Sequence, residues 1–267
     1  MAPVRERAPR VASVLFATVA VCAVCYVPAA GDLIAWDDFE SYSPGGLNNG
    51  AGGDGWSGNW SAAAAASVVA SGIPARGQSM QILPPSGNSL AERSFPQQTG
   101  DVYVGMELHT ANIGSSNFLQ VYVNASSGES WDSGVSGGIR NTSANPYFAR
   151  IDGWENSTNS STAFHVNDQM GLLVLRFSRS GSKYERTDVF VDQPTEGAPD
   201  ATHTTGDSGT SGLSRIHFRT YGLDADDLIL IDSLRIATDY AHAVPGPLPV
   251  ALLLLGAPAL ARRRRPR

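Results

Sequence analysis

Short runs of alternating hydrophobic and polar residues make up most of the chain after residue 31, and each run is closed by Gly, Ser, Asn, Asp or Pro. In one such run, Leu173, Leu175 and Phe177 would share one face of an extended strand, and Arg176 and Ser178 would share the other. No run keeps the 3.6-residue period of an amphipathic helix. The pattern therefore predicts strands joined by turns.

Twelve strands are expected in one domain. The run 214–221 places His217, Arg219 and Tyr221 on the wetter face, which is typical of antiparallel sheets that are half exposed to water. The polar stretches 44–61, 126–136, 156–162 and 194–211 are predicted loops. The expected fold is an all-β, antiparallel sandwich of two sheets, with strands at 33–39, 62–69, 79–83, 90–95, 102–109, 118–124, 138–141, 147–152, 171–178, 184–192, 214–221 and 228–237.

The first thirty residues have the pattern of a secretory signal peptide. Three arginines precede an apolar run over 11–27, and small residues follow at 29–30. Both cysteines, Cys22 and Cys25, lie inside the apolar run. The mature domain, expected at 31–243, therefore contains no disulfide and must be stabilised by burial.

The last residues form a second candidate sorting segment, at 244–267. It begins with Val244, Pro245, Gly246 and Pro247, continues with an apolar stretch at 249–261, and ends in a basic cluster that includes Arg262, Arg263, Arg264 and Arg265. The apolar stretch predicts a short membrane helix. By the positive-inside rule the arginines stay in the cytoplasm, which places the domain on the far side of the membrane.

Charge changes once these two segments are set aside. Eleven basic and twenty-four acidic residues remain, so the mature domain carries a net charge near -13. Such an excess argues against nucleic acid and anionic membrane surfaces as partners, and it is compatible with cation binding.

Two resemblances follow from these segments. The tail is similar to the PEP-CTERM sorting signal of Gram-negative exopolysaccharide producers, with Gly246 where the family usually has Glu. Residues 36–60, with FESY followed by GWSGNW, resemble the opening of concanavalin A-like (laminin G-like) jelly rolls, and 174–194 and 228–244 resemble the closing half. The resemblance implies signal peptidase and exosortase as processing partners, a membrane-bound intermediate, and then a cell-surface or extracellular-matrix location.

The candidate catalytic patterns are weak. The E-x-D-x-x-E run of laminarinase-like relatives is absent, and Glu129 with Asp132 would point to opposite faces of a strand. GDSG at 206–209 has no accompanying histidine segment and is read as a turn, and the scattered histidines give no zinc site. The sequence therefore predicts that the domain is not an enzyme. A glycoside hydrolase or polysaccharide lyase with unrecognised catalytic residues is one alternative, and a purely structural matrix protein is another.

A calcium site is implied by the same resemblance. In laminarinase-like relatives the ion lies between the first and last strands, and the matching residues here are Asp38, Glu40 and Asp232. The alternative is that Asp232 pairs with Arg235 or caps a strand edge. The acidic cluster at 224–227 is expected to form a solvated turn.

Tryptophans in polar segments are the candidate sugar contacts. Trp131 and Trp154 are predicted to stack on a glycan, whereas Trp56 and Trp60 are expected to pack beneath loops. The leading hypothesis is an exported, non-catalytic carbohydrate-binding module whose partner is a surface polysaccharide.

Overall fold

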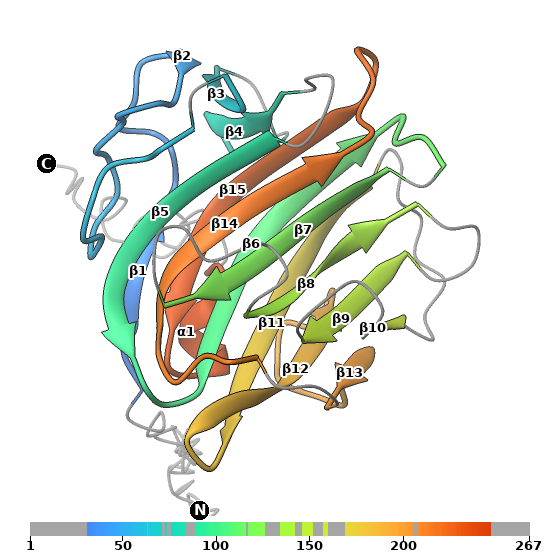
Figure 1. Ribbon diagram of the computed structural model, residues 1–267. Helices are drawn as coiled ribbons and strands as arrows, with labels where there is room; N and C mark the ends of the chain where they lie inside the picture. Colours follow the sequence, from blue (N-terminus) through green and yellow to red (C-terminus); the bar gives the residue numbers. More distant parts are fainter. Residues whose placement is uncertain are drawn as a thin grey trace, which may run out of the picture.

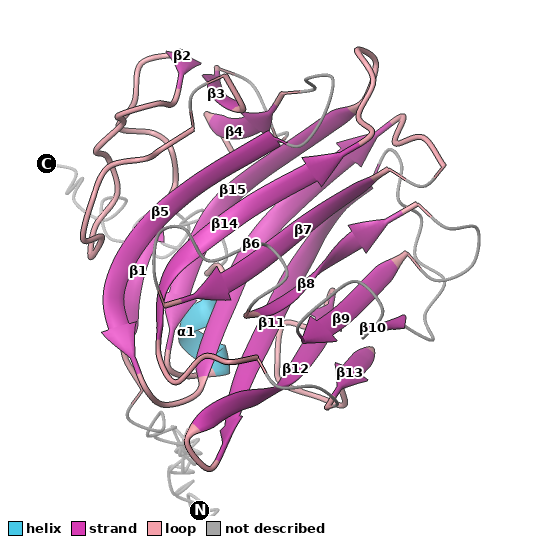
Figure 2. Cartoon of the chain, viewed as in Figure 1, coloured by secondary structure: helices cyan, strands magenta, loops and turns pink. Residues whose placement is uncertain are grey.

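Two antiparallel β-sheets face each other in the computed structural model (Figures 1 and 2). The structure describes residues 31–62, 64–70, 73, 76–83, 89–115, 117–125, 134–141, 146–151, 157–159, 169–204 and 208–246. The prediction of an all-β, two-sheet fold is confirmed, since the one helix described, α1 (Tyr240–Ala243), has only four residues.

The larger sheet, sheet A, has nine strands in the order β13-β12-β11-β6-β15-β4-β3-β2, with β1 also paired to β15. Its strands are β1 (Leu33–Asp37), β2 (Gly45–Gly46), β3 (Ala66–Val69), β4 (Ser79–Ile82), β6 (Val102–Ala111), β11 (Gln169–Ser180), β12 (Lys183–Val191), β13 (Ala201–His203) and β15 (Leu228–Ala237).

The smaller sheet, sheet B, has six strands in the order β10-β9-β8-β7-β14-β5. Its strands are β5 (Ser89–Gln98), β7 (Phe118–Asn124), β8 (Val135–Arg140), β9 (Tyr147–Ile151), β10 (Ser157–Asn159) and β14 (Leu213–Tyr221). In Figure 1 sheet B lies in front of sheet A, so the viewer looks onto the outer face of sheet B.

Each expected strand has a counterpart, but three segments expected as loops contain short strands. These are β2, β10 and β13, which lie within the predicted loops 44–61, 156–162 and 194–211. They have two or three residues each, too few for an alternating pattern, and each pairs with a longer strand at a sheet edge. These segments become strands because they pair with the edge strand of a sheet, and their own composition does not predict that pairing.

The core fills the space between the sheets. Ala91 and Phe95 of β5, Val121 of β7, and Ile216 and Phe218 of β14 are all buried in one cluster with side chains of sheet A. The residues that alternate with these core residues along each strand therefore point away from sheet A, because successive side chains of a strand alternate between its faces.

A buried polar cluster anchors the opening segment. The carboxylate of Asp37 accepts hydrogen bonds from Tyr42 Oη at 2.6 Å and Trp60 Nε1 at 3.2 Å, and it lies 2.7 Å from NH1 of Arg93. The Arg93 guanidinium also lies over the Trp56 ring, 4.7 Å from its centroid. The expected packing role of Trp56 and Trp60 is confirmed: Trp60 is buried, and Trp56 packs against the core.

The two ends of the sandwich lie together. β1 pairs with β15, and the backbone N of Thr238 donates to the carbonyl of Asp32 at 3.0 Å. The helix α1 follows and packs Tyr240 against Tyr103 and Phe190 on the outer face of sheet A. None of the helices among the described residues is long and apolar enough to span a membrane, and the predicted membrane segment 249–261 lies outside them.

Candidate functional site

A continuous band of polar side chains crosses the outer face of sheet B. Its central row runs through register partners on five strands: Glu92, His217, Tyr122, Ser136 and Arg150. Each of these positions alternates with a core residue, so all five side chains face away from sheet A. The alternation in β5, β14 and β7 therefore assembles the band from segments far apart in the sequence.

His217 is at the centre of the band and is 1% exposed. Its Nε2 lies 2.9 Å from Oδ1 of Asn124, and its Nδ1 lies 2.9 Å from Oε2 of Glu92. Each ring nitrogen of His217 therefore has an oxygen atom that can accept a hydrogen bond within 2.9 Å. The contact with His217 holds the pKa of Glu92 below its usual value, against the opposite effect of burial.

Tyr122 stacks flat on His217. The two ring centroids are 4.1 Å apart with an interplanar angle of 4°. Burial raises the pKa of Tyr122 to about 12, so its hydroxyl keeps its proton at neutral pH. Between described residues no hydrogen bond uses this hydroxyl, and the phenol ring covers one face of the imidazole.

The next row carries Arg219 and Gln120, which are register partners. NH1 of Arg219 donates to Oε1 of Gln120 at 3.2 Å, and Nε2 of Gln120 donates to Oγ of Ser136 at 3.0 Å. On the other side of the central row, NH1 of Arg215 donates to Oε1 of Glu92 at 2.6 Å. These bonds fix the guanidinium groups in place.

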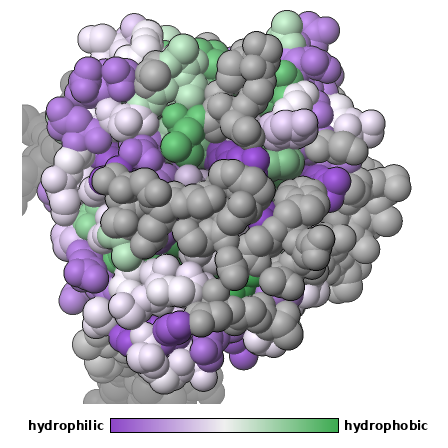
Figure 3. All heavy atoms as spheres, in the orientation of Figure 1, coloured by the Kyte–Doolittle hydropathy of each residue, from purple (hydrophilic) through white to green (hydrophobic). Residues whose placement is uncertain are grey.

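The band is buried in its middle and partly exposed along β5 and β14. The side chains of Glu92 and Arg215 are 17% and 21% exposed, whereas Arg150 and Gln120 are almost fully buried. In the orientation of Figure 1, Figure 3 shows mainly hydrophilic side chains on the described surface, with a small apolar group near the top. Arg215 and Glu92 are therefore the most exposed of the described side chains in the band.

The sequence reasoning missed this band, although the signal was present. Gln120, Tyr122 and Asn124 alternate with aliphatic residues in the middle of an expected strand, and His217 and Arg219 alternate with core residues in another. The wetter face of 214–221 was recognised, but nothing in the sequence paired it with 118–124. Only the strand order β5, β14, β7 brings the two sets together.

The predicted calcium ligands are brought only partly together. Oε1 of Glu40 accepts from the backbone N of Gln78 at 2.6 Å, and Oδ2 of Asp232 accepts from Oγ of the next residue, Ser79, at 3.2 Å. Asp38 instead accepts from the backbone N of Glu40, at 3.2 Å. In the part of the chain that is described, no three acidic, His or Cys side chains are arranged to hold a metal ion.

Burial raises the pKa of Asp232 to about 7, and the nearby carboxylates Glu107 and Glu40 add to the shift. Asp232 and Glu107 are register partners on β15 and β6. The calcium site therefore stays a prediction, in which Glu40 and Asp232 bind the neighbouring residues Gln78 and Ser79.

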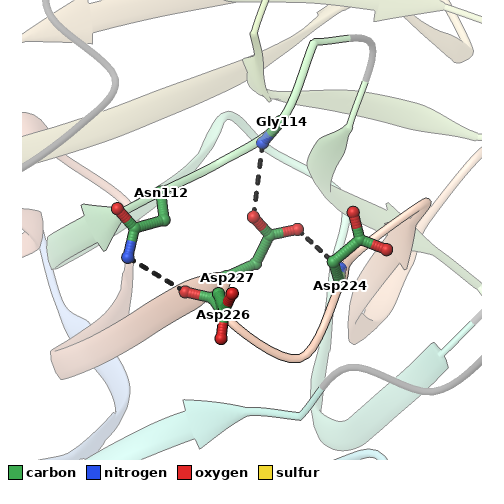
Figure 4. A pocket seen from close by; sticks show the side chains of 5 residues that line it. All are labelled: Asn112, Gly114, Asp224, Asp226 and Asp227. Carbon is green, nitrogen blue, oxygen red and sulfur yellow. Dashed lines mark hydrogen bonds between the residues drawn. The ribbon is translucent and has the colours of Figure 1, made fainter.

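An open pocket of about 480 Å³ lies at the other acidic cluster, lined by Asn112, Gly114, Asp224, Asp226 and Asp227 (Figure 4). Both oxygens of Asp227 are used, one accepting from Gly114 N at 3.3 Å and the other from Asp224 N at 2.7 Å. Asp227 is 5% exposed, so the expected solvated turn is wrong for this residue. Its carboxylate holds the turn together from inside, and Asp224 and Asp226 are exposed as expected.

Several predicted site residues lie outside the described residues. These are Trp131, Trp154, Glu129, Asp132, Pro247 and Arg262 to Arg265. Of the sorting box, Val244 is half-buried and its backbone N donates to Tyr240 O at 3.0 Å. In the GDSG segment, Oγ of Ser208 is buried and accepts from Thr210 N at 3.2 Å, in agreement with a turn.

No protein-family model and no curated protein sequence matches this chain. The alginate lyase Aly36B is similar in structure, at 12% identity and a TM-score of 0.48, covering 77% of this chain and 96% of that one. An endo-β-1,4-glucuronan lyase from the fungus Trichoderma reesei has 12% identity and a TM-score of 0.47, covering 76% of this chain and 97% of the lyase.

The potassium-bound carbohydrate recognition domain of Emp46p has 12% identity and a TM-score of 0.47, covering 68% of this chain and 89% of that domain. The chain spans only 16% of the length of a sialidase that it also matches. A carbohydrate esterase of the bacteriophage phi24B matches as well. The similar structures are thus proteins of carbohydrate recognition or chemistry.

The prediction that the domain is not an enzyme is wrong, because the similar structures include lyases and an esterase. It rested on the missing E-x-D-x-x-E run. That run tests for one type of site, in which two carboxylates flank the bond. A site built from Tyr, His and Arg, such as the band on sheet B, does not contain it.

Proposed function

We propose that the outer face of sheet B binds an acidic polysaccharide, in an exported domain of the concanavalin A-like jelly-roll type. One observation carries the proposal. Arg150, Arg215, Arg219 and His217 lie on this face, where the described strands of sheet B present one acidic side chain, Glu92. This concentration of basic side chains occurs in a domain whose net charge is near -13.

The chemistry of the band suits a uronate. Guanidinium groups bind carboxylates through paired, charge-assisted hydrogen bonds. Gln120, Ser136 and Tyr122 add amide and hydroxyl groups that can bond sugar hydroxyls. Since Arg219 and Arg215 lie on opposite sides of His217 along β14, carboxylates of a polymer could meet both.

The test is binding of a polyuronate to the purified protein and to two variants. Arg215→Ala removes a partly exposed cation of the band, and we expect its affinity to fall about tenfold, the equivalent of about 1.4 kcal/mol. The matched control is Arg186→Ala, because Arg186 is 43% exposed on β12 of sheet A, away from the band. Equal losses in the two variants, or no loss in Arg215→Ala, would contradict the proposal.

A second candidate function, eliminative cleavage of the bound chain, is favoured by the hydroxyl of Tyr122, which no hydrogen bond between described residues uses. In this reaction the C5 hydrogen of a uronate leaves as a proton, the bond from C4 to the glycosidic oxygen breaks, and a double bond forms between C4 and C5. Tyr122 would give its proton to the departing oxygen and regain one from C5. The guanidinium of Arg219 would stabilise the charge that develops at the carboxylate.

Tyr122→Phe separates the two functions, because it removes the hydroxyl and keeps the ring that stacks on His217. If the protein cleaves, ultraviolet absorbance of the unsaturated product should appear with the wild type and be lost in this variant, while binding persists. If the wild type binds polyuronates but forms no unsaturated product, the cleavage function is wrong and only the binding function remains.

We further infer that the chain is exported through the signal peptide 1–30 and processed by an exosortase at 244–267. The two sequence patterns support this inference. The mass of the mature protein tests it: we expect a chain that begins near Gly31 and ends near the box at 244–247.

Calcium binding at Glu40 and Asp232 remains part of the proposal. Support comes from the mutual repulsion of these carboxylates, which a cation would relieve. Calcium should then raise the melting temperature of the wild type and leave that of Asp232→Asn unchanged. An equal effect of calcium on both proteins would exclude Asp232 as a ligand.

A further inference from the structure

Tyr221 is the most exposed of the large hydrophobic side chains that the structure describes, at 52%. Its ring does not project alone into solvent. It stacks on Phe118, with ring centroids 5.8 Å apart and an interplanar angle of 18°. Phe118 is 4% exposed, so the pair forms a fixed aromatic surface with one open side.

This aromatic pair adjoins the polar band. Tyr221 lies two residues after Arg219 on β14, so both side chains are on the outer face of sheet B. The Arg219 guanidinium lies 5.1 Å from the centroid of Phe118, and it also donates to Gln120. Phe118 therefore contacts both the exposed tyrosine and the nearest cation of the band.

The spacing suits a polymeric ligand. Two residues along a strand span about 6.6 Å, which is comparable to the length of one pyranose unit in an extended chain. A sugar ring carries C–H groups on its faces, which pack on aromatic rings, whereas its carboxylate binds guanidinium. One unit on Tyr221 would place the carboxylate of the next unit near Arg219. Leu90, the register partner of Arg219, is 40% exposed and adds an apolar edge.

We propose that Tyr221, backed by Phe118, is a stacking subsite for one pyranose ring of an acidic polysaccharide, and that the carboxylate of the next sugar unit binds Arg219. The inference rests on the proposed function and deepens it. The ligand lies along β14 and extends past the end of the charged band, so the site recognises consecutive units of a chain and not a single sugar acid.

The test compares a single uronate with a tetrauronate, measured by calorimetry on the wild type and three variants. Tyr221→Ala should lose about tenfold in affinity for the tetrasaccharide, within the range of aromatic packing energies, and should bind the single uronate like the wild type. Tyr221→Phe should stay within about twofold, because the ring is kept. Met170→Ala is the control, since Met170 is also exposed, at 51%, but belongs to sheet A.

Each outcome decides one of the two proposals. If the wild type binds the tetrasaccharide and Tyr221→Ala binds it equally well, the proposed stacking subsite is wrong, and the proposal that the polar band binds the polysaccharide is unaffected. Equal losses for the single uronate and the tetrasaccharide would also contradict a subsite beyond Arg219. If the wild type binds neither ligand, the proposed function fails together with the subsite.

Discussion

Two groups of ionisable side chains are buried in this sandwich, one on each side of sheet B. Asp37 and Arg93 are 0% and 3% exposed, and they neutralise each other beside Tyr42 and Trp60. His217 is equally buried but lies between Glu92 and Asn124 on the opposite side of sheet B. The first set connects the opening segment to the core, and the second forms the candidate site.

Arg93→Met should be strongly destabilising. It leaves the Asp37 carboxylate buried without its counter-ion, which costs about 3–5 kcal/mol of unfolding free energy in comparable cases. The control Arg186→Met breaks a contact to Asp188 from a side chain that is 43% exposed, and it should cost less than about 1 kcal/mol. Urea unfolding of both variants measures the difference. Similar losses would mean that the Asp37 pair is not a structural centre.

Asp232 predicts a pH dependence of stability. Its pKa is about 7 in the folded protein and about 3.9 in an unfolded chain, so the folded state holds the additional proton between these values. The contribution of Asp232 is therefore greatest below about pH 4 and is lost as the pH rises to about 7. The stability of the wild type relative to Asp232→Asn, from urea midpoints, should fall across this range. A constant difference would contradict the raised pKa.

At the scale of elements, the strand pairs β14–β7 and β7–β8 create the site. A Cβ at Gly138 on β8 would lie 2.1 Å from the carbonyl oxygen of Leu119 on β7, so only glycine allows these strands to approach. Gly138 is also the register partner of Gln120. The geometry of the band therefore depends on a residue without a side chain.

Gly138→Ala should destabilise the protein by about 1–3 kcal/mol, because the backbone must shift to admit the methyl group. It should also weaken polyuronate binding, since Gln120 moves with β7. The matched control is Gly100→Ala, where a Cβ would meet nothing within 4 Å. Loss of stability in both variants alike would point to a general effect of alanine and not to strand approach.

Local pattern was enough to predict the strands. Alternation located the strands that became β5, β7 and β14, and polar composition located most of the loops. The local pattern could not predict the order of strands in the sheet. That order depends on contacts between residues far apart in the sequence, such as Glu92, His217 and Tyr122. For the same reason the candidate site was sought among tryptophans and acidic residues close in sequence, whereas the structure assembles a site from separate strands.

At the scale of the whole molecule, charge is unevenly distributed. The mature domain is acidic overall, yet the outer face of sheet B carries three arginines and His217. A net negative protein repels a polyanion at long range, and this repulsion is screened by salt within about 8–10 Å. Binding at such a face depends on short-range pairing of carboxylates with fixed guanidinium groups.

The most direct test of this account compares one polyuronate with its carboxyl-reduced form, which has the same backbone without the charges. Affinity of the purified protein for both is measured at fixed ionic strength. We expect binding of the polyuronate and a loss of at least about tenfold for the reduced polymer, since each lost charge pair at Arg215 or Arg219 is worth roughly 1–2 kcal/mol. Equal affinity for the two polymers would contradict the assignment of the band as a carboxylate-binding site.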